Sequence, residues 1–120
     1  MPVTIQPVIM TPGLDRLLGF YTELLTAREV SRFPPEGPTF YVGLQIGASM
    51  LGLVADAGVD TGASQRMLIS VDVDSVDSLL GRVEAAGGRV LGLPNDMPWG
   101  QRVAHLHDPD GNLVNLTQPI

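Results

Sequence analysis

The chain has 120 residues and a mass of 12.8 kDa, the size of one small domain or of two half-sized modules that share a core. Its hydrophobic content of 44% indicates a globular protein and argues against intrinsic disorder. The formal charge is −6, every basic residue is an arginine and there is no cysteine, which argues against nucleic-acid binding, disulfides, zinc knuckles and thiol nucleophiles.

The first residues, "MPVTIQPVIMTPG", contain neither a basic region nor a long apolar run. They therefore predict no signal peptide and no membrane anchor. The expected location is the cytoplasm, and no membrane partner is expected.

The first half of the chain predicts a strand, a helix and three more strands. Alternating residues predict a strand over about 3–11, and "GLDRLLGFYTELL", at about 13–25, has its leucines at helical spacing. Two breaks, "PPEGP" and "GAS", separate three further strands near 27–33, 38–47 and 50–56. The small and polar residues of about 58–66 predict a linker.

After the linker the same order of elements starts again. "RMLISVDV" predicts a strand, and "SVDSLLGRVEAAG", at about 75–87, predicts a helix that Asp74 caps and a glycine pair ends. Three more strands are expected near 88–93, 101–107 and 112–118. A shift of about 62 residues also places "LDRLLG" on "VDSLLG", and such self-similarity indicates duplicated βαβββ units.

The predicted fold is therefore of the α+β class, a single domain with module 1 at about 1–57 and module 2 at about 67–120. Neither module can bury a sheet face alone at this size, so we expect the modules to pair, within one chain or between two chains. Their curved mixed sheets would then surround a cleft, with the helices on the convex side.

Two segments carry a resemblance to a known family. They are "GLDRLLGFYTELL", after the first strand, and "PWGQRVAHLHDPDGNLVNL", which contains the closing hairpin. With them the chain resembles the vicinal oxygen chelate superfamily, which includes glyoxalase I, extradiol dioxygenases, fosfomycin-resistance enzymes and bleomycin-resistance binding proteins. The resemblance covers essentially the whole chain, identifies no single reaction, and implies a homodimer because small members pair their modules across chains.

The resemblance also assigns metal binding to the first and last strand of each module. In this chain the four positions fall on Gln6, Gly52, Leu68 and Asn115, where catalytic members use histidine, glutamine or glutamate. Glycine and leucine offer no ligand, and two neutral amides are weak ligands for a dication, which needs three or more protein ligands with imidazole or carboxylate groups. We therefore predict no bound metal, no other cofactor and no catalytic residue.

The two histidines lie on the strand before the final turn. His105 and His107 alternate with apolar residues and are expected to face the cleft, where they could share a metal if a third ligand were available. The nearest acid, Asp108, begins the turn "DPDGN" and is expected to make an Asx-type hydrogen bond there. We therefore expect a polar or stacking pocket wall. A further acid, Asp72, could face the same cleft.

The expected cleft is mostly apolar with a few neutral hydrogen-bonding groups, as in binding sites for flat or amphipathic organic molecules. Its predicted strand residues are Gln6, Val8, Met10, Leu68, Ser70, Val103, His105, Leu113, Asn115 and Thr117. Nearby strands or loops add Phe33, Tyr41, Trp99 and Arg102. Trp99 lies between proline and glycine in a loop that could hold its indole over the cleft mouth, and the alternative is a packing role. Arg102 could pair with a ligand acid or with an aspartate.

These features lead to three hypotheses. The first is a metal-free homodimer of the bleomycin-resistance type, which sequesters a small aromatic natural product or antibiotic. The second is a glyoxalase-like lyase or isomerase, or a dioxygenase, with a reduced metal site at Gln6, His105 and Asn115. The third is an accessory protein that docks on a biosynthetic enzyme, which an acidic surface permits without favouring.

Overall fold

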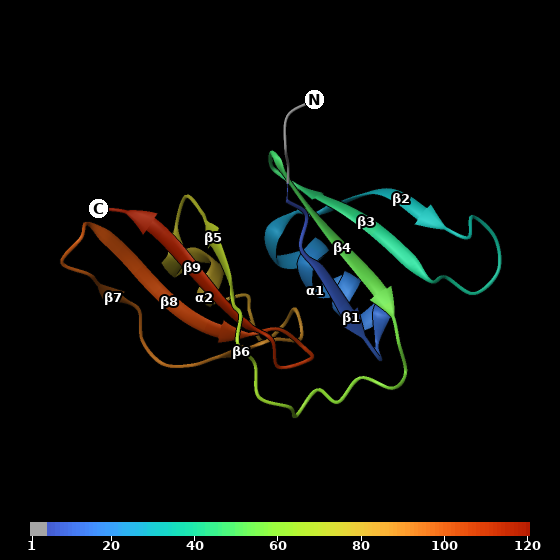
Figure 1. The fold of residues 1–120 in the computed structure, drawn as a ribbon. Helices are drawn as coiled ribbons and strands as arrows, with labels where there is room; N and C mark the ends of the chain where they lie inside the picture. The colour runs from blue at the N-terminus through green and yellow to red at the C-terminus, as the bar shows by residue number, and fades with distance from the viewer. Residues whose placement is uncertain (1–4) are drawn as a thin grey trace. The chain divides into compact units, whose positions relative to one another are not determined.

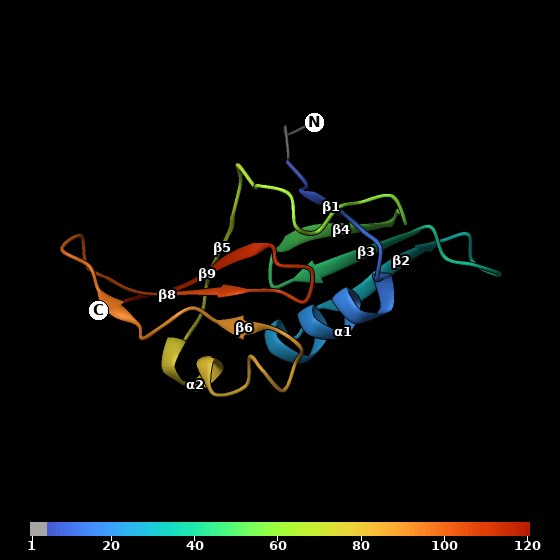
Figure 2. The same cartoon turned by 90° about the horizontal axis from the view of Figure 1, so that it is seen from below.

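The computed structural model of the chain describes residues 5–120. The chain divides into two compact units, Met1–Asp60 and Thr61–Ile120. Each unit contains one mixed sheet with a helix against one of its faces (Figures 1 and 2). This arrangement confirms the predicted α+β class.

The sheet of the first unit has four strands in the order β1-β4-β3-β2. They are β1 (Val8–Thr11), β2 (Arg28–Phe33), β3 (Tyr41–Ile46) and β4 (Ser49–Ala55). β1 runs parallel to β4, and the other neighbouring strands are antiparallel. The predicted strand over 3–11 begins at Val8, and its first two residues lie outside the described part of the chain.

Helix α1 (Leu14–Leu25) covers one face of this sheet, as Figure 2 shows, and confirms the helix predicted at 13–25. Its apolar residues recur every three or four positions and so fall on one side of the helix. That side and the matching side of the strands form the core of the unit, which consists of Leu17, Phe20, Tyr21, Leu24, Val42, Leu44, Leu51 and Leu53.

The second unit repeats this plan. Its strands are β5 (Ile69–Asp72), β6 (Arg89–Val90), β7 (Asn95–Asp96), β8 (Gln101–His107) and β9 (Leu113–Pro119). They form a sheet in the order β5-β9-β8-β6, with β7 paired to β8, and β5 runs parallel to β9. Helix α2 (Val76–Leu80) lies at one face, and the core consists of Val76, Val83, Ala104, Leu106, Val114 and Leu116.

The hydrogen-bonded register of the strands confirms the repeat seen in the sequence. In the first unit Val8, Gly52 and Gly43 are paired side by side across β1, β4 and β3. In the second unit Ser70, Asn115 and His105 are paired in the same way across β5, β9 and β8. The two units therefore place corresponding residues at corresponding points of their sheets.

The second helix differs from its prediction. α2 ends at Leu80, and the chain continues through turns to Gly87, with hydrogen bonds such as Arg82 N to Leu79 O that tighten the helix end. Its cap also differs, because the hydroxyl of Ser75, and not Asp74, accepts the hydrogen bond from Ser78 N. Within residues 5–120 neither helix has the length and apolar character needed to cross a membrane.

Two strands of the second unit also differ from their predictions. The strand expected at 88–93 is limited to Arg89–Val90, because Gly92 has φ of 109° and turns the chain away from extended geometry. β7, a two-residue strand, lies in the stretch that was predicted as a loop. Both are short because they pair only with the edge of β8.

Candidate functional site

Most of the predicted binding residues lie on the face of each sheet that its helix leaves uncovered, which we call the open face. On the strands they alternate with the buried core residues, so their side chains point away from the helix. In the first unit this face carries Val8, Met10, Ser31, Phe33, Tyr41, Gly43, Gly52 and Val54. In the second unit it carries Ser70, Asp72, Val103, His105, His107, Leu113, Asn115 and Thr117.

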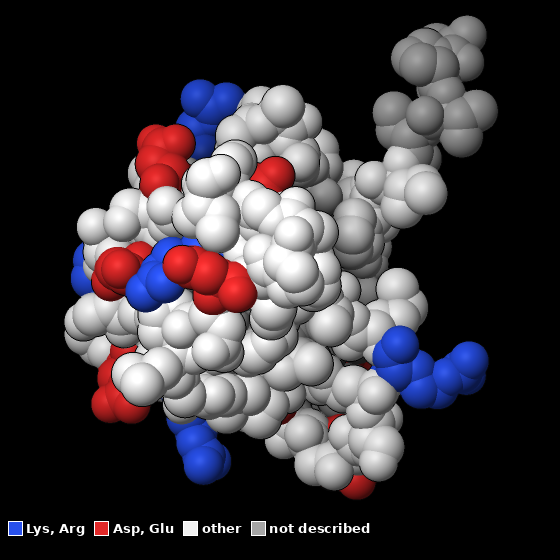
Figure 3. Space-filling view, turned by 90° about the vertical axis from the view of Figure 1, so that its left-hand side faces the viewer, with Lys and Arg blue, Asp and Glu red and all other residues white. Residues whose placement is uncertain are grey.

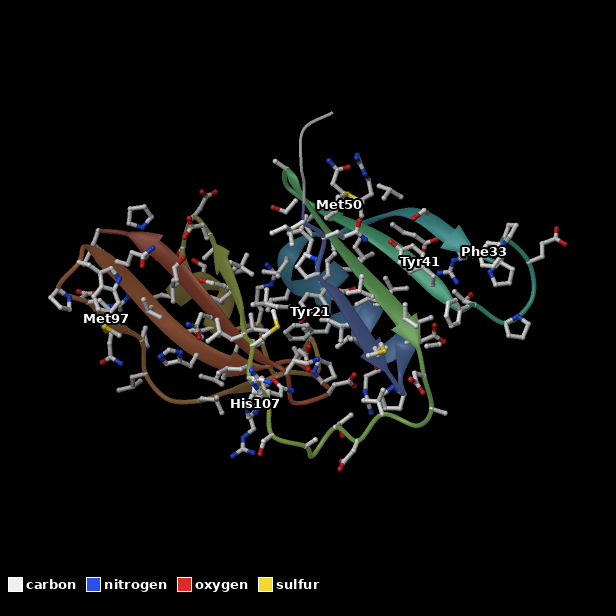
Figure 4. All side chains as sticks on the ribbon, in the orientation of Figure 1. Tyr21, Phe33, Tyr41, Met50, Met97 and His107 are labelled. Atoms are coloured by element: carbon white, nitrogen blue, oxygen red, sulfur yellow. The ribbon has the colours of Figure 1, made fainter. Side chains whose placement is uncertain are left out.

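The open face of the first unit has an exposed apolar rim. Val8 is 51% exposed, Met10 57% and Phe33 63%. Phe33 is paired with Tyr41 on the neighbouring strand, and both are labelled in Figure 4. Exposed apolar side chains that gather on one sheet face are typical of surfaces that bind a ligand or a partner.

Two glycines lie at the centre of this face and shape it. Gly43 and Gly52 are paired across β3 and β4, and both are buried although α1 lies against the opposite face of the sheet. A Cβ at Gly52 would lie 3.0 Å from Tyr41 Cε1 and 3.0 Å from Gln6 Nε2. The ring of Tyr41 therefore occupies space that a side chain at Gly43 or Gly52 would need.

Polar groups surround this pair of glycines. The Tyr41 hydroxyl accepts a hydrogen bond of 2.8 Å from Gln6 Nε2. A Cβ at Gly43 would collide with Ser31 Oγ and lie 3.2 Å from the Tyr41 hydroxyl oxygen, so both hydroxyls stand beside the same point. We call Gln6, Ser31 and Tyr41, with Gly43 and Gly52 beneath them, the tyrosine slot. Ser31 and Gly43 were not predicted, although the alternation in "YVGLQI" puts Gly43 on the same face as Tyr41.

The open face of the second unit has a row of polar side chains across three strands. Ser70, Asn115 and His105 lie side by side in register across β5, β9 and β8. His105 Nδ1 lies 2.6 Å from Asn115 Oδ1. An amide oxygen accepts and does not donate, so Nδ1 is the donor in this contact, and Nε2 takes no part in it.

The remaining open-face residues of this unit lie on the same strands, on either side of that row. Thr117 and Val103 are buried, Leu113 and His107 are half-buried, and the Thr117 hydroxyl donates a hydrogen bond to the carboxylate of Asp72. Asp108 makes the predicted Asx-type bond, accepting at one carboxylate oxygen from Asp110 N and Asn112 N at 3.0 and 2.9 Å. Asp108 therefore fixes the turn that follows β8.

Trp99 and Arg102 have different environments. Trp99 is 67% exposed, and its indole Nε1 donates to Gln101 Oε1 at 2.9 Å. The structure places Arg102 on the helix side of β8, where its guanidinium contacts Asp96 at 2.8 Å and Asp77 at 3.1 Å. These hydrogen bonds, that of Asp96 first, raise the pKa of Arg102 above its ordinary value. Of the two roles predicted for Arg102, the pairing with aspartate is the one observed.

The linker predicted at 58–66 contains a residue that sequence reasoning missed. Gln65 Oε1 accepts from Leu113 N at 3.1 Å, and its Nε2 donates to Asn112 Oδ1 at 2.9 Å. The side chain thereby joins this stretch to the start of β9. The sequence gives no signal for such a contact, because it joins residues far apart in the chain.

The four positions that the resemblance assigns to metal ligands do not fit a divalent ion. The amide nitrogen of Gln6 is bound to Tyr41, and the amide oxygen of Asn115 is bound to His105. Gly52 has no side chain, and Leu68 offers only an aliphatic one that is 45% exposed. Within residues 5–120, no group of three or more His, Cys, Asp or Glu side chains is placed to hold a metal ion.

The surface of the molecule in Figure 3 carries mostly uncharged side chains. Acidic and basic groups occur there singly or in small groups of mixed sign. On this face the basic residues do not form the continuous patch that binding to a phosphate backbone would need.

Comparisons with known proteins agree with the fold of the chain. The model of the Glyoxalase/Bleomycin resistance protein/Dioxygenase superfamily matches residues 4–116. An uncharacterized protein of Mycobacterium bovis is 25% identical, over 97% of this chain and 83% of its own length.

Two solved structures have the same fold. A glyoxalase/bleomycin resistance protein/dioxygenase family enzyme from Burkholderia phytofirmans gives a TM-score of 0.81 at 22% identity, covering 96% of this chain and 97% of the other. A bleomycin resistance determinant encoded on the transposon Tn5 gives a TM-score of 0.70 at 25% identity, covering 98% of both chains.

Proposed function

Since the chain belongs to the glyoxalase/bleomycin resistance protein/dioxygenase superfamily, we propose that it binds a small, flat, aromatic natural product without a metal ion and acts by sequestering it. The proposal includes a cytoplasmic homodimer. The similarity to the Tn5 bleomycin resistance determinant supports it, because the two proteins match over 98% of the length of each chain.

One observation carries the proposal. At the four positions where the superfamily's enzymes bind a metal, the only two polar side chains are bound to their neighbours, Gln6 to Tyr41 and Asn115 to His105. A divalent ion would have to break the contact between Asn115 and His105, and it would gain two neutral amide ligands at most, fewer than a working site needs. Affinity for a ligand must then come from apolar burial, stacking and hydrogen bonds to neutral groups.

The open faces offer these interactions. Val8, Met10 and Phe33 provide exposed apolar area, and Trp99 provides an exposed aromatic ring that one hydrogen bond tethers. Such tethering lowers the entropy that a side chain loses when it stacks on a ligand. Tyr41, Ser70 and His105 Nε2 can orient a bound molecule through hydrogen bonds, each contributing about 1 kcal/mol.

The test combines metal analysis with ligand binding. Protein purified without chelator is analysed for Zn, Ni and Fe, and planar polycyclic antibiotics are screened by quenching of Trp99 fluorescence, with and without EDTA. We expect no stoichiometric metal, and binding that EDTA leaves unchanged. About one equivalent of metal per chain, with binding abolished by EDTA, would instead show a metal-dependent protein. A screen in which no aromatic compound binds would reject the binding function.

A further inference from the structure

The tyrosine slot contains hydrogen-bonding groups that the protein does not use itself. Tyr41 accepts from Gln6 Nε2 and, among residues 5–120, finds no acceptor for its own hydroxyl proton. Ser31 Oγ and Gln6 Oε1 likewise have no hydrogen-bond partner within this described part of the chain. A phenol that accepts a hydrogen bond from an amide can still donate its own O–H proton, and no group in the slot accepts that proton.

The position of this donor is fixed from two sides. Gly43 and Gly52 lie under the ring, and the Gln6 amide holds the oxygen at 2.8 Å. One acceptor site of the phenol oxygen is thus occupied, so its proton points away from Gln6. The donor is only half-buried, which leaves it open to a molecule that lies on the face.

The surroundings of the donor define the group that it would bind. Val8, Met10 and Phe33 form an apolar rim around a neutral centre, and no charged side chain belongs to the slot. A phenol donates to a carbonyl oxygen without a change in charge, and an apolar rim favours a flat ring system around that carbonyl. A carboxylate or phosphate would lose its hydration here without a cation to replace it.

We infer that Tyr41 selects the ligand, by donating its hydroxyl proton to the carbonyl oxygen of a planar aromatic ketone or lactam that lies on the open face of the first unit. The inference rests on the proposed function and narrows it to one chemical class. It makes Tyr41 a specificity-determining residue, with Gln6 as the residue that positions it.

A matched pair of probes tests this inference. 9-Fluorenone and fluorene are both flat tricycles and differ only at C9, which is a carbonyl group in 9-fluorenone and a CH2 group in fluorene. We expect wild-type protein to bind 9-fluorenone more tightly than fluorene. Tyr41→Phe should weaken binding of 9-fluorenone by about three- to tenfold, the loss of one neutral hydrogen bond, and leave fluorene binding unchanged. Calorimetry or NMR titration measures both affinities.

A spectroscopic readout separates a direct hydrogen bond from a packing effect. A hydrogen bond to the ketone lowers its infrared carbonyl stretching frequency, so the frequency of bound 9-fluorenone should be lower in wild-type protein than in Tyr41→Phe. Gly52→Ala is a second variant, because its methyl group would lie 3.0 Å from both the Tyr41 ring and the Gln6 amide, which must then shift by a few tenths of an ångström while the backbone keeps its ordinary strand conformation. Its preference for the ketone should therefore be weaker than that of wild-type protein.

The outcomes distinguish this inference from the function on which it rests. The role of Tyr41 would be overturned if wild-type protein bound the two probes equally, or if Tyr41→Phe kept the preference for the ketone. In either case, binding of other aromatic compounds would still support the proposed function. Failure of 9-fluorenone to bind at all would overturn the inference as well. Only the absence of binding by every aromatic compound tested would reject both.

Discussion

Tyr41 and Trp99 are both aromatic residues of open sheet surfaces, but the chain holds them differently. The Tyr41 ring is half-buried over two glycines, with its hydroxyl bound to Gln6. Trp99 is mostly exposed, and a single hydrogen bond to Gln101 holds its indole. Gln101 stands on the same side of β8 as Val103, two residues on, so this bond draws the indole toward the open face of the second unit.

Replacement of Trp99 tests whether this ring binds the ligand. Trp99→Ala should weaken binding of planar aromatic compounds by about 1–3 kcal/mol, because it removes the largest exposed apolar side chain of the chain. Calorimetry measures the loss, since the variant contains no tryptophan. Gln101→Ala is the control, because it keeps the ring and removes only its tether, so its effect should be smaller. A folded Trp99→Ala protein with unchanged affinity would show that the ring is not a ligand contact.

Among the helices and turns, two glycines with free space around them differ in backbone conformation. Gly19 lies inside α1 and has an ordinary helical backbone, and no atom would lie within 4 Å of a side-chain methyl group at this position. Gly47, in the turn between β3 and β4, also has free space but has φ of 58°. The two positions differ in the backbone conformation that they require, and neither is crowded.

This contrast predicts opposite effects of the same substitution. Gly19→Ala should raise the free energy of unfolding by about 0.5–1 kcal/mol, since alanine loses less backbone entropy in a helix. Gly47→Ala should lower it by a similar amount or more, because alanine is strained at positive φ. Urea unfolding measures both. Stabilisation by Gly47→Ala would show that this turn adopts another conformation.

At the scale of the whole molecule, the chain consists of two small units of the same design, each with one sheet face that its own helix leaves uncovered. The exposed apolar residues Val8, Met10 and Phe33 lie on the open face of the first unit, and Leu68, itself exposed, adjoins β5 in the second. A chain of this size buries too little apolar surface to leave such faces in water without loss of stability.

Association would remove part of this exposed surface. We therefore predict a homodimer at micromolar concentration, with about twice the 12.8 kDa mass of one chain by light scattering. A dilution series should show the mass falling only at much lower concentration. The mass of a single chain at high micromolar concentration would contradict the prediction.

The sequence by itself determined the α+β class, the order of the main elements and the internal repeat. These depend on local periodicity and on self-similarity, which a single chain displays directly, and α1 therefore lies where the spacing of its leucines puts it. The residue types also show directly that Gly52 and Leu68, two positions that the resemblance assigns to metal ligands, offer no ligand group. The end of α2 was not visible in this way, because a run of turns from Gly81 onward can still bury Val83 and mimic helical spacing.

Only the tertiary structure decided which side chains meet. The pairing of β3 with β4 sets Gly43 against Gly52 and so makes room for Tyr41, and the pairing of β8 with β9 sets His105 against Asn115. Arg102 binds Asp77 and Asp96 because it lies on the helix side of β8, and Gln65 reaches β9 from a stretch that reads as a linker. Such contacts join residues distant in the chain, and strand register and side-chain packing fix them, neither of which local sequence pattern specifies.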